Sequence, residues 1–321
     1  MHSESASIMD GYRQRQSRMP FLSFPHTSSF SPYYLAVRAR AHDWFIAAGV
    51  VPDNSVARFL NSDYTQLTAM IHPACDAERL EKLTRYYLLW FAMEERDEEL
   101  WQEQGGVRRF YKDVIAYLDS GETDSTDPWL VAYAQTVEDL CLSPRLRERH
   151  RVWKKDWLEG EIRVADYGNT PHPNFMEDRH KSIGVMVALS VLCQYGLGVD
   201  LPDSVLDHDD MHAFLGCLVR VSSWQSDILT LDAEQARGEV VNTVNVLMAQ
   251  HNLSQEEGIN QIYRRYREDL ARAYTCLGVV LGHPWEADQG SVDAYCNSAL
   301  DLAYGFLRWN QLTDRYVPGI T

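Results

Sequence analysis

The sequence lacks closely spaced cysteines, a long apolar run and a signal-peptide pattern. Its six cysteines lie far apart without any C-x-x-C pair, which argues against a disulfide scaffold and a cysteine-based zinc site. The longest apolar stretch, "IGVMVALSVLC" from Ile183, is well short of the roughly 20 residues that a membrane span needs. The N-terminus, "MHSESASIMDGYRQRQ", has no apolar signal-peptide run. We therefore expect a soluble, cytoplasmic protein with reduced thiols and no membrane span.

Positive charge is also scarce. The formal net charge is -16, which argues against a general nucleic-acid binder because a phosphate backbone demands a positive surface. An acidic protein can nevertheless bind a polyanion when divalent metal ions bridge the two. The charge therefore excludes nucleic acid as a partner and leaves small polyanions open.

The apolar residues follow a helical pattern, and alternating β patterns are scarce. Residues 1–32 are polar and contain three prolines, which predicts an irregular N-terminal arm. Over residues 33–321, apolar residues recur at three- and four-residue steps between breaks that carry Pro or Gly. We expect helices at 33–49, 54–70, 76–104, 107–120, 127–141, 144–166, 174–196, 208–235, 239–250, 254–282 and 289–312. With short connections and no Gly- or Ser-rich linker, they predict one all-α domain.

An acidic segment follows the most apolar part of one predicted helix. In "WFAMEERDEELW", Glu94 and Glu98 are four residues apart and share a helix face, as do Glu95 and Glu99. Like charges at this spacing repel by about 0.2 to 0.5 kcal/mol per pair. A solvated helix end, partly neutralised by Arg96, would explain the segment. The alternative is a cavity mouth that binds Mg²⁺, which prefers oxygen ligands.

A second set of oxygen donors lies in "SSWQSDILTLDAEQARGE", residues 222–239. Ser226, Thr230 and Glu234 recur at steps of four, so a helix places two hydroxyls and a carboxylate on one face, beside Asp227. Ordinary helix surface would explain this set by itself. Two such sets on separate helices could, however, hold metal ions between them, and those ions would let an acidic protein bind a diphosphate.

These segments resemble the class I terpene synthases, particularly the microbial single-domain type, and the resemblance runs from about residue 25 to 316. The segment "SDILTLDAEQARGEVVN" follows the family's second metal motif and its Arg-Gly-Glu-x-x-Asn tail, with Asp227, Thr230, Glu234 and Asn242 in register. The C-terminal "RWNQLTDRY" is similar to the family's closing pattern of a Trp followed by an Arg-Tyr pair. The resemblance implies an all-α helical bundle around a central cavity.

The metal motifs depart from the family pattern at several positions. The first motif is normally Asp-Asp-x-x-Asp or Glu, and here the matching residues begin at Glu94 and end at Glu98. Ser226 stands where the family usually has Asn, and Ala233 where it often has Lys or Arg. Since a glutamate reaches one methylene further than an aspartate, we expect metal binding with a shifted geometry.

The diphosphate sensor departs as well. The family places an Arg four residues before a helix-breaking Gly. In "MEDRHKSIGVMV" that Gly would be Gly184, and the residue four positions before it is His180, flanked by Arg179 and Lys181. An unperturbed histidine is a cation only below a pKa near 6.5. Either neighbour could therefore take over the sensor's task.

The resemblance implies a site built from residues of these motifs. It assigns about three Mg²⁺ ions to Glu94, Glu95, Glu98, Ser226, Asp227, Thr230 and Glu234, and the diphosphate to Arg179, His180, Lys181, Arg315 and Tyr316. Phe91, Trp224 and Trp309 neighbour these motifs, and aromatic faces stabilise a cation by about 0.5 to 2 kcal/mol each. Each of the three would also serve as a core residue.

Three functions are consistent with the sequence. The leading hypothesis is a magnesium-dependent terpene cyclase that ionises a prenyl diphosphate and forms a cyclic sesquiterpene hydrocarbon or alcohol. Farnesyl diphosphate is the substrate best suited to a single domain of this length. A relative that couples the prenyl cation to an amine or alcohol is the second. The third is a non-catalytic helical binding protein. A homodimer is frequent in the family, and the sequence leaves the oligomeric state open.

Overall fold

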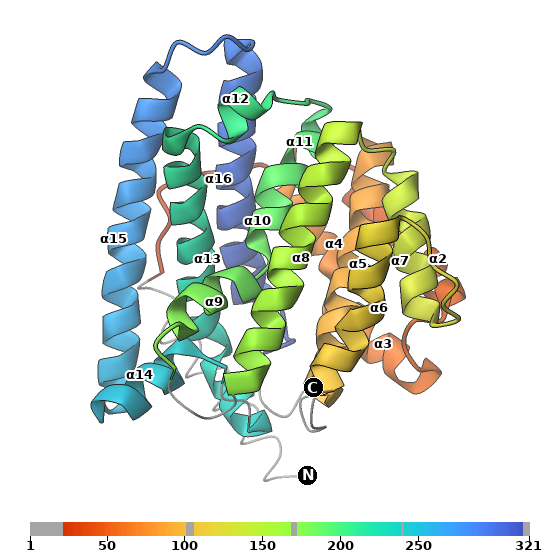
Figure 1. Ribbon diagram of the computed structural model, residues 1–321, viewed down its shortest axis with the longest axis horizontal. Coiled ribbons are helices and arrows are strands. Elements are labelled where there is room, and N and C mark those ends of the chain that lie inside the picture. The colour runs from red at the N-terminus through yellow and green to blue at the C-terminus, as the bar shows by residue number, and fades with distance from the viewer. Residues whose placement is uncertain (1–21, 101–105, 168–171, 239–240, 317–321) are drawn as a thin grey trace.

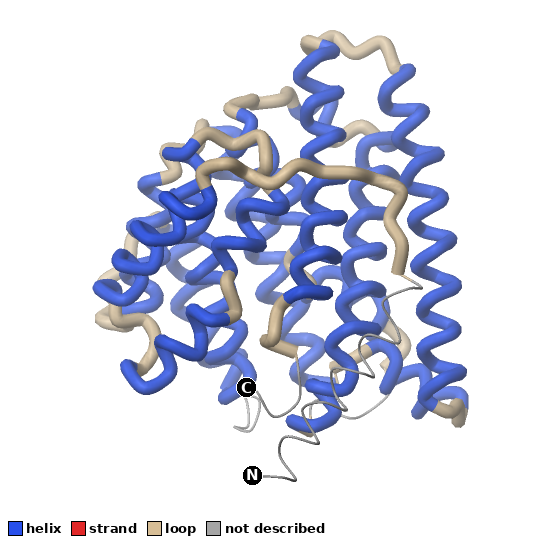
Figure 2. The backbone as a smooth tube through the Cα atoms, turned by 180° about the vertical axis from the view of Figure 1, so that it is seen from behind, coloured by secondary structure: helices blue, strands red, loops and turns tan. Residues whose placement is uncertain are grey.

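The computed structural model describes residues 22–100, 106–167, 172–238 and 241–316. Every regular element in this described part is a helix, as Figure 2 shows. The elements are α2 (Tyr34–Ala48), α3 (Asp53–Asn61), α4 (Tyr64–Ile71), α5 (Ala77–Leu100), α6 (Gly106–Ser120), α7 (Pro128–Asp139), α8 (Pro144–Tyr167), α9 (Phe175–Ser182), α10 (Val185–Val187), the π-helical turn η2 (Ala188–Leu192), α11 (Cys193–Leu197), α12 (Asp203–Leu206), α13 (Asp209–Arg237), α14 (Thr243–His251), α15 (Gln255–Gly282) and α16 (Gln289–Leu312). The predicted all-α fold is confirmed.

The long helices run side by side as a bundle. In Figure 1, α13, α15 and α16 form one side, α5, α6 and α7 form the other, and α8 lies between them. α12 precedes α13 at the upper end of the view and α14 follows it at the lower end, so α13 spans the bundle. In the part that the structure describes, no helix is long and apolar enough to cross a membrane.

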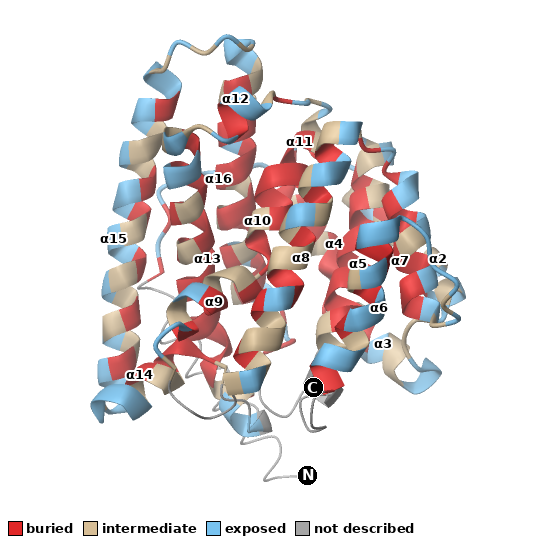
Figure 3. Cartoon of the chain, in the orientation of Figure 1, coloured by how far each residue is buried: buried red, intermediate tan, exposed pale blue. Residues whose placement is uncertain are grey.

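Helical periodicity in the sequence explains how each helix faces the core. In α15 the buried residues recur at steps of three, four and seven, namely Gly258, Ile262, Tyr266, Leu270, Ala273 and Val280. Residues at these spacings lie on one stripe of a helix. Figure 3 shows the result, with buried faces turned toward the interior of the bundle and exposed faces turned outward.

Two of the predicted helices are divided in the structure. The expected helix 54–70 is split between α3 and α4, because Asp63 has a left-handed φ of 51° and caps α4 with its side chain. The expected helix 174–196 is broken at Gly184, which has a φ of 69°. α9 lies before the break, and α10, η2 and α11 follow it. Left-handed residues cannot continue a right-handed helix. α14 begins later than predicted because Asn242 is its N-cap and accepts a hydrogen bond from the Val244 amide.

The described part of the N-terminal arm, residues 22–32, contains no helix and crosses the back of the bundle (Figure 2). The hydroxyl of Tyr266 donates to the Ser23 carbonyl at 3.0 Å. His26 Nε2 lies 2.7 Å from a carboxylate oxygen of Asp301 on α16. Contacts with α15 and α16 therefore hold the arm against the bundle.

Candidate active site

A cavity of about 160 Å³ lies among α4, α5, α8, α9, α13 and α16. Its wall has an apolar part and a polar part. The apolar and aromatic residues are Leu67, Ile71, Tyr87, Trp90, Phe91, Ile183, Val185, Ala188, Val241, Leu302 and Phe306, and the others are Glu94, Glu161, Arg179, Ser182, Ser226, Thr230, Glu234, Arg315 and Tyr316. A cavity with carboxylates and guanidinium groups against an apolar wall suits a ligand with a charged head and an apolar body.

On α5, the two neighbouring glutamates of the first acidic set have different surroundings. Glu94 lines the cavity, and its carboxylate accepts a hydrogen bond from Trp90 Nε1 at 2.8 Å. Glu95 is not among the cavity-lining residues, and its carboxylate lies 3.7 Å from Arg58 Nη2. The side chain of Glu98 lies outside the described part of the structure. Among the described acids of the first set, Glu94 is therefore the one that faces the cavity.

The second set lies on α13, and three of its oxygen donors line the same cavity. These are Ser226, Thr230 and Glu234. The Thr230 hydroxyl donates to the Ser226 carbonyl one turn earlier, at 3.0 Å, which leaves its oxygen lone pairs available. Asn242 Nδ2 donates to a Glu234 carboxylate oxygen at 2.7 Å and thereby holds that side chain. The sequence spacing thus places the three donors on one wall.

Asp227, the fourth predicted donor on α13, is fully buried and is engaged by protein groups. Arg179 donates to one of its carboxylate oxygens from Nε at 3.1 Å and from Nη2 at 2.7 Å. The Thr243 amide donates to the other oxygen at 3.1 Å. Asp227 does not line the cavity. Its position fits a role in holding Arg179, and a role for Asp227 as a metal ligand stays a prediction.

Three consecutive basic residues on α9 face three different environments. Arg179 lines the cavity. Burial alone would lower its pKa, but the Asp227 carboxylate outweighs this effect and raises the pKa above its ordinary value, so the guanidinium stays charged. The imidazole of His180 is outside the cavity, in an edge contact with the Trp224 ring, and burial lowers its pKa to about 4. Lys181 lies 3.2 Å from Glu177 at the surface. The spacing to Gly184 aligned His180 with the family's sensor arginine, but the residue that lines the cavity is Arg179.

The C-terminal segment after α16 brings Arg315 and Tyr316 to the cavity. Nη2 of Arg315 lies 3.6 Å from the Glu94 carboxylate, and its Nη1 donates to the Tyr64 hydroxyl. The guanidinium carbon also lies 5.2 Å from the centre of the Phe91 ring, within the range of a cation–π contact. Two guanidinium groups, from α9 and from the C-terminal segment, therefore lie at one cavity.

Of the three predicted cavity aromatics, the structure places Phe91 in the wall. Trp224 and Trp309 are buried and are not among the residues that line the cavity, although the Trp309 ring packs behind Phe91 at 5.5 Å, so their predicted contact with a cation stays a prediction. Trp224 Nε1 donates to Asp269 on α15 at 2.8 Å, and Trp309 Nε1 donates to the Ser62 carbonyl at 3.2 Å. A large indole near a motif in the sequence does not reveal which side of its helix the ring occupies.

Sequence reasoning missed Glu161, which reaches the cavity from α8. Its carboxylate accepts a hydrogen bond from Trp157 Nε1 at 3.3 Å. Burial raises its pKa to about 7, Arg179 opposes the shift, and the Glu94 charge adds to it. The sequence gives little signal for this residue, because it is one of several acids on a strongly charged helix.

The donor set of the cavity fits a hard divalent cation. Glu94, Ser226, Thr230 and Glu234 offer only oxygen atoms, the donors that Mg²⁺ prefers. In the described residues, no three carboxylates of this cavity lie within 4.8 Å of one another. Sparse protein ligands are typical of Mg²⁺ sites that use one or two carboxylates together with phosphate oxygens and water.

Comparison with known proteins identifies the class of protein that this fold and cavity define. A family model described as "Terpene synthase family 2, C-terminal metal binding" matches residues 74–272, more than half of the chain. The chain therefore belongs to the terpene synthase family, and it is a class I terpene synthase.

Individual relatives are similar at low identity over most of the chain. Sesquiterpene synthase 6 of Postia placenta is 24% identical over 84% of this chain and 80% of its own length. Pentalenene synthase of Streptomyces avermitilis is 25% identical over 73% of this chain and 72% of its own length. The crystal structure of germacradien-4-ol synthase from Streptomyces citricolor superposes with a TM-score of 0.79 at 16% identity, covering 91% of this chain and 98% of that one. The solved structure supports the fold.

Proposed function

We propose that this protein is a magnesium-dependent terpene cyclase that ionises farnesyl diphosphate to a cyclic sesquiterpene hydrocarbon or alcohol. The observation that carries the proposal is one cavity in which oxygen donors from α5 and α13 meet guanidinium groups from α9 and the C-terminal segment. An apolar wall completes the cavity. Such a cavity suits a diphosphate head with an isoprenoid tail.

Glu94, Ser226, Thr230 and Glu234 are the described residues placed to hold Mg²⁺. Glu95, Glu98 and Asp227 remain predictions as ligands, on the family resemblance alone. When bound, about three such ions would supply Lewis-acid charge that stabilises the departing diphosphate. Cytoplasmic location and a homodimer also remain predictions.

The protein's own cations would bind and orient the diphosphate. Arg179 is held by Asp227, and Arg315 is held by the Tyr64 hydroxyl, so both guanidinium groups are positioned before substrate arrives. Tyr316 also lines the cavity, and its hydroxyl would add a hydrogen-bond donor to the diphosphate. Charge-assisted hydrogen bonds from prepositioned groups stabilise the negative charge that grows on the leaving group.

The apolar wall would shield the allylic cation from water until cyclisation ends. Phe91 presents an aromatic ring to the cavity, and Leu302 and Phe306 face it from α16. A ring near the cation contributes about 0.5 to 2 kcal/mol. No step requires a protein nucleophile, because the diphosphate leaves by ionisation.

The name of one relative, Sesquiterpene synthase 6 of Postia placenta, supports a C15 substrate. The cavity volume of about 160 Å³ is close to that of a cavity of roughly 150 Å³ that admits benzene, and this cavity is partly open. A farnesyl chain is larger than this volume, so it would extend into the opening of the cavity or displace side chains of the wall. The chain length of the substrate is tested separately from ionisation, by comparing C10, C15 and C20 prenyl diphosphates.

The test is incubation of the purified protein with geranyl, farnesyl and geranylgeranyl diphosphates, with Mg²⁺ or with EDTA. Volatile products and released pyrophosphate are both measured. We expect cyclic C15 products and pyrophosphate only with Mg²⁺. If pyrophosphate were released only with an added amine or alcohol, the reaction would be prenyl transfer and the proposed cyclisation would be wrong. If no substrate were turned over, the proposal would be refuted.

A matched pair of variants on α13 tests the site. Glu234→Gln removes the charge of a cavity-lining carboxylate, whereas Asp232→Asn makes the same change two residues earlier, outside the cavity wall. We expect Glu234→Gln to lower turnover by about 100-fold or more and Asp232→Asn to have little effect. Equal losses would contradict the assignment of this wall.

A further inference from the structure

A second group of potential metal ligands lies at the opposite end of α13 from the active site. One nitrogen each of His208 and His283 and one carboxylate oxygen of Asp210 all lie within 4.8 Å of one another. Asp210 precedes Ser226 by sixteen residues on the same helix, or about 24 Å at 1.5 Å per residue. The group is therefore separate from the cavity described above.

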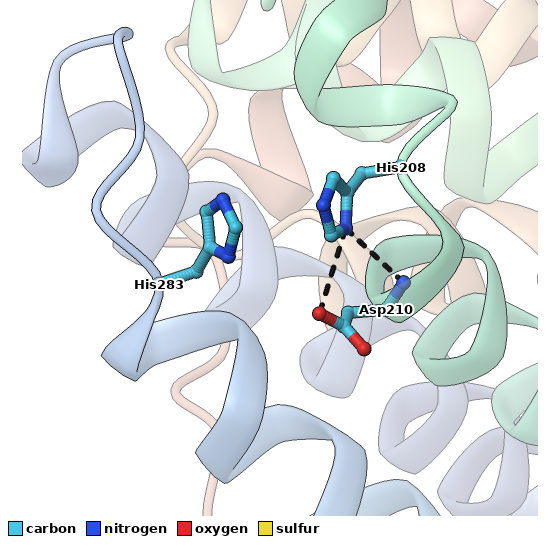
Figure 4. Close-up of side chains that lie close together, drawn as sticks. All are labelled: His208, Asp210 and His283. Carbon is cyan, nitrogen blue, oxygen red and sulfur yellow. Dashed lines mark hydrogen bonds and ion pairs between the residues drawn. The ribbon is translucent and has the colours of Figure 1, made fainter.

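Local structure explains why these three side chains meet. His208 is the N-cap of α13, and its Nδ1 accepts a hydrogen bond from the Asp210 amide at 3.3 Å. His283 is the C-cap of α15, which packs antiparallel to α13. Figure 4 shows the two imidazole rings facing each other across the gap between the helices, with the Asp210 carboxylate beside His208.

We infer that His208, Asp210 and His283 form a binding site for a zinc-like divalent transition-metal ion. In a tetrahedral zinc site with bonds near 2.0 to 2.1 Å, ligand atoms are about 3.4 Å apart. His208 Nδ1 and the nearer Asp210 oxygen are 3.5 Å apart. One ligand atom from each of the three residues lies within 4.8 Å of the others, so small side-chain shifts would bring them to zinc spacing, and ligation through His208 Nδ1 would replace the hydrogen bond that this nitrogen accepts from the Asp210 amide.

The donor chemistry selects against magnesium. Two imidazoles and one carboxylate suit zinc and neighbouring transition metals, whereas Mg²⁺ prefers oxygen donors only. The side chains of His208 and Asp210 are 34% and 40% exposed, so the ion can enter from solvent and a water molecule can complete its coordination. The partial positive charge at the start of α13 and the partial negative charge at the end of α15 offset each other here. The negative charge of Asp210 therefore favours a cation.

Trp285 holds the imidazoles in place. Its ring centroid lies 4.1 Å from that of His283 and 5.1 Å from that of His208. Its Nε1 donates to the Val280 carbonyl at 2.9 Å, which fixes the indole against the end of α15. A fixed indole against both rings limits their rotation and reduces the ordering that metal binding requires. A bound ion would cross-link the start of α13 to the end of α15.

Calorimetric titration of the metal-free protein with Zn²⁺ tests the inference. We expect one equivalent of Zn²⁺ to bind and to raise the thermal unfolding temperature. His283→Ala and Asp210→Asn should each weaken this binding by at least about tenfold. His208→Asn should do so too, while keeping a side-chain acceptor for the helix cap. His251→Ala is the matched control, since His251 is exposed on α14 and should leave binding unchanged.

Cobalt distinguishes this site from the oxygen donors of the cavity. Co²⁺ in a tetrahedral nitrogen and oxygen site absorbs visible light strongly, whereas Co²⁺ in an octahedral oxygen site absorbs weakly. We expect the strong absorption in the native protein and its loss in His283→Ala and His283→Gln. Metal affinity and spectra that are the same in His283→Ala and the native protein would overturn the inference. Zinc binding that depends on Glu234 but not on His283 would do so as well.

Discussion

Gly184, at the break between α9 and α10, offers a sharp test of how the helix break shapes the cavity. Its φ is 69°, and a methyl group added to it would lie 2.5 Å from Cζ2 of Trp90 and 2.8 Å from Cδ2 of Trp157. These two indoles are stacked at 4.1 Å, and Trp90 donates a hydrogen bond to Glu94 in the cavity. An alanine at this position therefore meets both backbone strain and a steric clash.

Gly49 separates the two effects. It has a similar φ of 61°, but a methyl group added there would have nothing within 4 Å. Left-handed backbone costs about 1 to 2 kcal/mol for a residue with a side chain. Overpacking against a rigid neighbour adds about 1 to 3 kcal/mol. We predict that Gly49→Ala lowers the free energy of unfolding by about 1 to 2 kcal/mol and that Gly184→Ala lowers it by about 2 to 5 kcal/mol.

Urea unfolding at equilibrium, with the slope of each transition compared, measures both losses. Turnover of the prenyl diphosphate is a second readout. Gly184→Ala should reduce turnover because displacement of Trp90 disturbs the Glu94 carboxylate, while Gly49→Ala should leave it unchanged. If the two variants lost equal stability, the indole pair would have to yield to the methyl group without cost, and the reasoning from the close contact would be refuted.

Three further predictions concern charged residues of the site. Arg179→Met should lower the free energy of unfolding by about 3 to 5 kcal/mol, because it leaves a buried carboxylate without its cation, whereas Lys181→Met, at the surface, should cost less than about 1 kcal/mol; equal losses in urea titrations would contradict this difference. Arg315→Ala should lower kcat/KM about 100-fold and His180→Ala should lower it less, because the imidazole lies outside the cavity wall; a larger loss at His180 in steady-state kinetics would reverse the assignment. The pKa of Glu161 is raised from its ordinary 4.5 to about 7, so the folded protein keeps a proton that the unfolded chain releases, and the free energy of unfolding falls as pH rises from about 4.5 to about 7. Glu161→Gln should flatten this dependence in unfolding experiments at several pH values, and an unchanged slope would show that another group causes it.

Most of the fold could be predicted from the sequence because helix formation leaves a local pattern. The spacing of apolar residues predicted the all-α architecture, and α16 has the same bounds as the predicted helix 289–312. The break at Asp63 was missed, since nothing in the apolar pattern of 54–70 signals a left-handed residue. The late start of α14 was missed because Asn242 was not recognised as its cap.

The sequence by itself determined that Ser226, Thr230 and Glu234 share one face, because residues four apart in a helix always do. Only the tertiary structure decided what that face meets. The position of α9 relative to α13 turned Arg179 rather than His180 toward the cavity, and the position of α8 brought Glu161 into it. Spacing along one helix is fixed by backbone hydrogen bonds, whereas distances between helices depend on how all of their side chains pack together.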